Sequence, residues 1–253
     1  MSGNTLITKF FAADQLKNYG KGSFKIGTLS EYRNSESSSA RMADTGEGIT
    51  ERRSPLSSGI MKSYRTLDGL VFSGNIWENC GSGFVASSVI NEYIFCATFG
   101  DYSKDTHKKL LYGCQLSEGH WYSGNPDLTH FAVINVEKFI LALRLWIKSR
   151  RRSFKKNFDP IGDIGGYQVV YRERFEELHQ PIVKYDELEN FDKIYLQSVF
   201  FKPPHFLPEN EFRISMNVHQ DGLPPEDALP LFPCSLGLKN SIVRFGQVKK
   251  SNR

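Results

Sequence analysis

The sequence predicts a single α+β domain with a mixed or antiparallel β-sheet core and several flanking helices. Patterns typical of strands and of helices follow one another irregularly, without an internal repeat or a linker that would separate two domains. Hydrophobic residues make up 40% and aromatic residues 13% of the 253 residues, which is enough for a buried core and excludes wholesale disorder, collagen and coiled coil. No uncharged apolar run approaches the roughly 20 residues of a transmembrane helix, so we expect no membrane partner.

The N-terminal segment predicts a strand, a short helix and a second strand. Leu6–Phe11 is apolar and rich in β-prone residues. Ala12–Tyr19 is compatible with a helix, because Asp14 would lie in its first turn and Gly20 follows its last residue. Phe24–Leu29 then alternates apolar and polar residues, as a strand with one buried face does.

The next part of the chain changes from polar to apolar. Residues 34–59 are the most polar stretch and predict a long surface loop or a mobile lid. Residues 60–100 alternate short β-like runs with glycine-containing turns. Within them, Tyr93–Phe99 is apolar throughout, which is typical of a central strand that is buried on both faces.

The clearest helix is expected over Asn135–Arg152. Asn135 is a favourable N-cap residue, and Glu137 suits the first turn. Apolar residues recur at helical spacing at Val136, Phe139, Ile140, Leu143 and Ile147. Basic residues gather at the C-terminal end, where the helix dipole favours cations.

Shorter elements are expected in the C-terminal half. The patterns predict a strand over Tyr167–Tyr171, a short helix over Glu173–Leu178 and a strand over Ile182–Tyr185. Asp192–Phe201 fits a helix or a strand. Phe212–Val218 alternates apolar and polar residues, so we expect a half-buried strand. Residues 222–234 are rich in proline and predict a loop, and Ser241–Phe245 predicts a last strand.

The net charge of +4 comes from one segment of the chain. Seven basic residues and no acidic residue lie between Arg144 and Lys156, so the rest of the chain carries a net charge of −3. This segment is either a solvated helix end or a patch that binds nucleic acid or another anionic partner, such as an acidic protein. The residues expected in such a patch are Lys148, Arg150, Arg151, Arg152, Lys155 and Lys156.

The four cysteines show no metal-binding pattern. No two of them stand in a CxxC pair, and no histidine lies at zinc-finger spacing from them. The first residues lack the basic segment and the long apolar run of a signal peptide. We therefore expect reduced thiols, a cytoplasmic location and no bound metal.

Two clusters of polar residues are candidates for a functional site. The first combines Tyr32 and Arg33 with Arg41, Asp44 and Glu47, the last three at a spacing that places them on one side of a helix. This cluster is either a solvated loop with weak ion pairs or a set of side chains that binds substrate.

The second cluster lies in the C-terminal half. Glu209, Glu211 and Arg213 alternate at the start of a predicted strand, so their side chains should share one face. They form either an exposed sheet face with a Glu–Arg pair or a functional carboxylate. In the functional case, the nearby cation holds the carboxylate ready to hydrogen-bond a sugar hydroxyl or to stabilise a cationic intermediate.

Four short motifs follow one another over about 200 residues of the chain. They are Lys9-Phe10, Phe95-Cys96-Ala97-Thr98, Lys202 and Glu209-Asn210-Glu211-Phe212-Arg213. In this order they resemble the pattern of a large, little-characterised group of bacterial and phage proteins.

The opening strand, helix and strand, together with the late Glu-x-Glu strand, also resemble the frame of ADP-ribosyltransferases. The resemblance implies that NAD is the substrate, that Lys9 contacts it and that Thr98 supports its nicotinamide side. It also implies that Glu211 orients the ribose, with Glu209 as the upstream member of the pair. Two positions depart from the family pattern: the early basic residue is Lys rather than Arg or His, and the middle motif lacks Ser-x-Ser.

Three hypotheses about function follow. The first is NAD-using ADP-ribosyl transfer or NAD glycohydrolysis, in a toxin or an anti-phage system, with Arg33 or Arg41 on the pyrophosphate. The second is a non-enzymatic module that binds a nucleotide or a nucleic acid through the same arginines and the basic patch. The third is a metal-dependent nuclease that uses Asp44, Glu47 and the late glutamates. The first hypothesis requires the early polar segment and the paired-glutamate strand to line one pocket.

Overall fold

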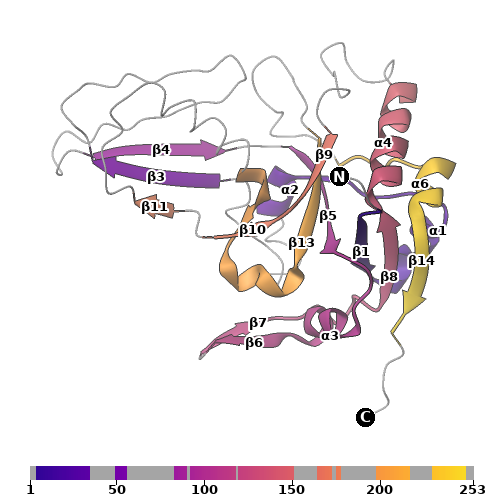
Figure 1. Ribbon diagram of the computed structural model, residues 1–253, viewed down its shortest axis with the longest axis horizontal. Helices are drawn as coiled ribbons and strands as arrows, with labels where there is room; N and C mark the ends of the chain where they lie inside the picture. The colour runs from indigo at the N-terminus through magenta and orange to yellow at the C-terminus, as the bar shows by residue number, and fades with distance from the viewer. Residues whose placement is uncertain are drawn as a thin grey trace.

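The computed structural model describes residues 4–34, 49–55, 83–89, 92–117, 119–150, 164–172, 175–177, 198–216 and 230–248. Helices occur there together with a mostly antiparallel sheet, which confirms the expected α+β fold (Figure 1). Within these ranges, no helix is long and apolar enough to cross a bilayer.

Seven strands of the described chain form the main sheet, in the order β14-β8-β1-β5-β13-β9, with β2 beside β5. Their bounds are Leu6–Phe11 (β1), Gly27–Thr28 (β2), Tyr93–Phe99 (β5), His130–Asn135 (β8), Ile164–Gln168 (β9), Glu211–Met216 (β13) and Ile242–Gln247 (β14). Paired strands in this sheet run antiparallel. The strand β5 has β1, β2 and β13 as partners and so lies at the centre, as its apolar sequence predicts.

Smaller sheets and short helices surround the main sheet (Figure 1). Three smaller sheets of the described chain join β3 (Ile49–Pro55) to β4 (Gly83–Val89) and β11 (Phe175–Glu177), β6 (Cys114–Ser117) to β7 (His120–Tyr122), and β10 (Val170–Tyr171) to β12 (Phe201–Lys202). The helices are η1 (Ala13–Gln15), α1 (Leu16–Gly20), α2 (Leu29–Asn34), α3 (Lys104–Tyr112), α4 (Val136–Arg150), η3 (Ser198–Phe200), η4 (Pro204–Glu209) and α6 (Leu236–Ser241).

The helices α4 and α6 cover one face of the main sheet. Phe139 and Leu143 of α4 and Leu238 of α6 are fully buried in one cluster with Ile7 of β1 and Phe95 of β5. The helix α4 begins where the sequence predicts, because the side-chain oxygen of the residue before it, Asn135, accepts a hydrogen bond of 2.9 Å from the backbone N–H of Lys138.

A second cluster lies on the opposite face of the sheet. Phe10 and Val133 point there and contact Leu110 of α3, Tyr122 of the β6–β7 hairpin and Phe206 of η4. The sheet is thus buried on both faces, and the second face is the one that carries the candidate site.

The pairing along one side of β5 is interrupted. Residues 98–99 of β5 pair with β1, and residues 93–94 pair with β2. Between these pairs, Nζ of Lys9 donates a hydrogen bond of 2.7 Å to the carbonyl oxygen of Cys96. A lysine ammonium therefore takes the place of a backbone donor at this point of the sheet.

Three predictions of local structure are wrong. The strand expected over Phe24–Leu29 is reduced to β2, because the hydroxyl of Thr28 accepts a hydrogen bond from the backbone N–H of Glu31 and begins helix α2. The loop expected over residues 34–59 contains β3, which pairs with β4. The segment Glu173–Leu178, where a helix is expected, contains strand β11 instead, because pairing with β3 outweighs local propensity.

The strand expected over Ile182–Tyr185 lies outside the described residues.

Candidate functional site

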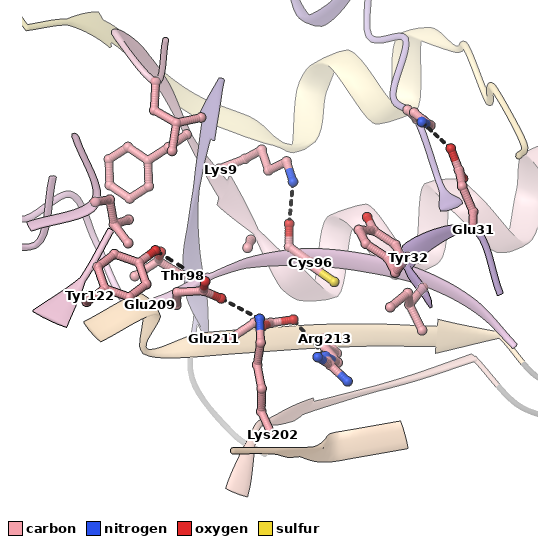
Figure 2. A pocket seen from close by; sticks show the side chains of 16 residues that line it. Lys9, Glu31, Tyr32, Cys96, Thr98, Tyr122, Lys202, Glu209, Glu211 and Arg213 are labelled. Carbon is pink, nitrogen blue, oxygen red and sulfur yellow. Dashed lines mark hydrogen bonds and ion pairs between the residues drawn. The ribbon is translucent and has the colours of Figure 1, made fainter. Parts of the chain in front are cut away.

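A cavity of about 270 Å³ opens on the second face of the main sheet (Figure 2). Strands β1, β5 and β13 form its floor, and α2, α3, β7, β12 and η4, together with Lys25 and Leu128 of the connecting segments, supply the rest of the described lining. Segments from both ends of the described chain therefore meet in one pocket.

Lys202 lies between two glutamates in this cavity. Its Nζ is 2.5 Å from Oε2 of Glu209 and 2.7 Å from Oε2 of Glu211. The same atom lies 4.3 Å from the centre of the Phe206 ring. Lys202 is buried, so a single ammonium is shared in a poorly solvated place by two carboxylates that would otherwise repel each other.

Arg213 completes the charge cluster. Its Nε is 2.6 Å from Oε1 of Glu211, and its guanidinium also donates a hydrogen bond to the carbonyl of Val199 in η3. The exposed fraction is 1% for Arg213 and 4% for Glu211. The alternatives of an exposed Glu–Arg pair and of a half-buried strand are therefore wrong: residues 198–202 cover the polar side of β13.

Glu209 also lies beside Lys202, but it is not part of strand β13, although the alternation of Glu209, Glu211 and Arg213 predicts that it is. It is the last residue of η4, and β13 begins only at Glu211. Between them, Asn210 has a left-handed backbone with φ of +42°. The side chain of Asn210 donates to the carbonyl of Phe99 at 3.2 Å and accepts from Nε2 of Gln168 at 2.9 Å. This turn, rather than a shared strand face, brings both carboxylates to Lys202.

Two tyrosines contact the glutamates. The hydroxyl of Tyr122 donates to Oε1 of Glu209 at 3.2 Å, and the backbone N–H of Glu211 donates to the hydroxyl of Tyr171 at 2.6 Å. Each of the four carboxylate oxygens of Glu209 and Glu211 thus has a donor, and each keeps lone pairs for a further hydrogen bond.

The surroundings push the pKa values of the two carboxyl groups apart. Burial alone would raise the pKa of Glu211, but the adjacent Arg213 and Lys202 outweigh it and hold this pKa well below its ordinary value. For Glu209 the burial is not fully offset by Lys202, and the charge of Glu211 adds to it, so the pKa is raised. The site therefore pairs a firmly ionised carboxylate with one that takes up a proton more readily.

Two further groups in the lining have shifted pKa values because they are removed from water. Burial lowers the pKa of the Lys9 ammonium, although the two glutamates partly offset it. Burial and the neighbouring Glu211 carboxylate raise the pKa of the Cys96 thiol. Cys96 is therefore a poor nucleophile.

The residues that the sequence predicts for the site fall into two groups. Those that line the cavity together are Lys9, Tyr32, Thr98, Glu209, Glu211 and Arg213. Arg33 is the next residue of α2 after Tyr32, and its side chain lies outside the described part of the structure. Arg41, Asp44 and Glu47 also lie outside the described residues. Tyr32 of the early polar cluster therefore lines the same cavity as Glu209 and Glu211.

The basic patch is described at one residue only. Lys148 is exposed on α4, which covers the sheet face opposite the cavity. Arg150 ends α4 with its side chain outside the described part, and Arg151, Arg152, Lys155 and Lys156 lie outside it altogether. A nucleic-acid or acidic-protein partner for this patch stays a prediction.

The sequence did not indicate a place in the site for three polar residues, which are Lys25, Tyr122 and Lys202. The Lys202 position was visible as part of the motif order, but the sequence did not indicate that it would bridge the glutamates. Tyr122 carries no local signal, because only the packing of the β6–β7 hairpin against η4 brings it to Glu209.

The cavity offers polar chemistry without an obvious metal position. Among the described residues, no group of three or more His, Cys, Asp or Glu side chains could hold a metal ion. The ammonium of Lys202 already occupies the space between Glu209 and Glu211 that a shared cation would take. The arrangement is suited to bind sugar hydroxyls and to stabilise positive charge on a bound molecule.

Comparisons of the chain with protein-family models, with curated proteins and with solved structures returned no match.

Proposed function

We propose that the protein cleaves the bond between nicotinamide and ribose in NAD, and transfers the ADP-ribosyl group to an acceptor or to water. One observation carries this proposal. Lys9 of β1, Thr98 of β5 and Glu211 of β13, the positions that the ADP-ribosyltransferase resemblance assigns, line the same cavity on neighbouring strands.

The chemistry needs a fixed negative charge beside the ribose. As the C1′–N bond breaks, its electron pair goes to the pyridinium nitrogen, and nicotinamide leaves as a neutral molecule. The ribose carbon develops oxocarbenium character, and the acceptor or water then bonds to C1′ and releases a proton. A carboxylate that stays ionised, as Glu211 does, stabilises this positive charge and accepts a hydrogen bond from the 2′-hydroxyl.

The test measures the release of nicotinamide from NAD by chromatography with the full chain. Wild-type protein should release nicotinamide, and Glu211→Gln should lower the rate by roughly 100-fold or more, because a preorganised charge is removed. Thermal unfolding of both proteins establishes that the variant is folded at the assay temperature.

Glu92→Gln is the matched control. Glu92 is also a buried glutamate, and it accepts a hydrogen bond from Ser215 of the same strand β13, but it does not line the cavity. We expect this variant to retain the wild-type rate when folded. If wild-type protein releases no nicotinamide, or if Glu211→Gln is as active as wild type, the proposed function is wrong.

A further inference from the structure

The charges that line the cavity do not cancel. Four cations and three carboxylates of the described chain lie in its wall. Lys25 pairs with Glu31, and the Lys202 and Arg213 cations pair with Glu209 and Glu211. One positive charge is therefore left over in the described part of the wall, and it belongs to Lys9.

Lys9 makes no ion pair within the described part of the chain. Its Nζ donates to the carbonyl of Cys96 and lies 5.3 Å from the centre of the Phe95 ring, at the interruption between β1 and β2. The side chain is half-buried, and burial lowers its pKa. An anion bound beside it would supply the missing charge and favour its protonated form.

The other polar end of the cavity is neutral overall and rich in acceptors. There, two carboxylates face two cations, and the hydroxyl of Tyr122 contacts Glu209 at 3.2 Å, the longest contact among the four carboxylate oxygens. Such a group accepts hydrogen bonds from sugar hydroxyls without requiring a charge on the ligand. The rings of Phe10 and Tyr32 add apolar wall for a flat base.

The cavity is also small. Its volume of about 270 Å³ lies just below the range of roughly 300–1,000 Å³ that is typical of small-molecule pockets. One base, one sugar and one phosphate suit this space, whereas a complete dinucleotide does not.

From the single uncompensated cation in the described part of the wall, the neutral hydroxyl-binding end and the size, we propose that the pocket recognises a nucleoside monophosphate unit. The one phosphate binds at Lys9, and the sugar hydroxyls bind at the Glu209–Lys202–Glu211 group. This proposal rests on the proposed function for the identity of the base, which is nicotinamide. The second phosphate and the adenosine of NAD then lie outside the cavity and contribute little to affinity.

The first experiment compares three ligands on the wild-type chain by titration calorimetry: NAD, nicotinamide mononucleotide and nicotinamide riboside. Nicotinamide mononucleotide should bind within about threefold of NAD. Nicotinamide riboside, which lacks the phosphate, should bind about tenfold to 100-fold more weakly, as expected for the loss of one charge-assisted hydrogen bond.

The second experiment places the phosphate. In Lys9→Met, nicotinamide mononucleotide and nicotinamide riboside should bind with affinities within about twofold of each other, because the cation that distinguishes them is gone. Lys138→Met is the matched control, since Lys138 is an exposed lysine of α4, on the opposite face of the sheet, and does not line the cavity. This control should keep the preference for the phosphate. If Lys9→Met does not fold, the comparison of the three ligands on the wild-type chain still tests whether the pocket prefers a ligand with one phosphate.

The outcomes separate this proposal from the proposed function. Release of nicotinamide from NAD, with nicotinamide mononucleotide binding more than about 100-fold more weakly than NAD, overturns the proposal and leaves the function standing. Binding of nicotinamide mononucleotide with the expected phosphate preference, but without cleavage of NAD, supports the proposal and overturns the function. A preference for phosphate that survives in Lys9→Met also overturns the proposal, because the phosphate would then bind elsewhere.

Discussion

At the residue scale, the ammonium of Lys202 forms ion pairs with two buried carboxylates, those of Glu209 and Glu211. Replacing it with Met in Lys202→Met leaves Glu209 and Glu211 facing each other with Arg213 as the one cation that pairs with them among the described residues. We expect the free energy of unfolding to fall by about 3–5 kcal/mol, the usual cost of removing one partner of a buried ion pair. Urea unfolding monitored by circular dichroism measures this.

Lys25→Met is the control for this prediction. Lys25 also pairs with a glutamate, Glu31, but its side chain is 55% exposed. Its loss should cost no more than about 1 kcal/mol, since water screens the pair. Similar losses in the two variants would contradict the buried, shared role of Lys202.

The pH dependence of stability follows from Glu211. Because its pKa in the folded protein lies well below the ordinary value, the folded protein keeps this carboxylate ionised while the unfolded chain takes up a proton. The stabilisation is therefore complete above the unfolded pKa of about 4.3 and is lost as the pH falls below it. The raised pKa of Glu209 acts in the opposite direction, in the range just above that value.

Glu211→Gln should flatten the acid side of the stability curve. The variant is less stable than wild type at neutral pH, and the difference should shrink as the pH falls from about 4 toward 2. Urea unfolding at a series of pH values checks this. An acid limb as steep in the variant as in wild type would show that other carboxylates determine it.

At the element scale, the turn between η4 and β13 positions the two glutamates. Asn210 has a φ of +42°, and asparagine tolerates this left-handed conformation better than most residues. Asn210→Gly and Asn210→Ala both lose the side-chain hydrogen bonds to Phe99 and Gln168, but only Ala also resists the backbone angle. Asn210→Ala should therefore be less stable than Asn210→Gly by about 1 kcal/mol in chemical unfolding. Equal stabilities would mean that the turn relaxes.

Elements with a strong local pattern were predictable from the sequence. β1, β5 and α4 occur where the apolar pattern and the Asn135 cap predict them, because their own residues encode both type and position. β8 is buried along its whole length, and its pairing with β1 and β14 rather than an alternating pattern makes it a strand. Short elements such as β11 depend in the same way on a distant partner.

The candidate site was predictable to a similar extent. The resemblance to ADP-ribosyltransferases led to Lys9, Thr98 and Glu211, and these residues line one cavity. The role of Lys202 and the approach of Tyr122 were not predictable, because both depend on how β12 and the β6–β7 hairpin fold over β13. The burial of both faces of β13 could not be predicted from its alternating sequence either, because distant segments of the chain cover its polar face.

At the scale of the whole molecule, the main sheet separates two packed regions. The α4 side supplies a large apolar cluster, and the other side supplies a smaller cluster and the polar cavity. The apolar packing under α4 and the proposed ligand site therefore lie on different faces of the same sheet.

Two leucines of α4 test this separation. Leu143 is fully buried against the sheet, whereas Leu141, two residues earlier, is 60% exposed. Leu143→Ala should lower the free energy of unfolding by about 2–5 kcal/mol, because a buried side chain is replaced by a cavity. Leu141→Ala should change it by no more than about 0.5 kcal/mol.

Because the cavity lies on the opposite face, folded Leu143→Ala should bind nicotinamide mononucleotide within about twofold of wild type, measured by calorimetry well below its melting temperature. A large loss of affinity in Leu143→Ala would mean instead that packing under α4 is transmitted through β5 to Lys9, and that the two faces are coupled.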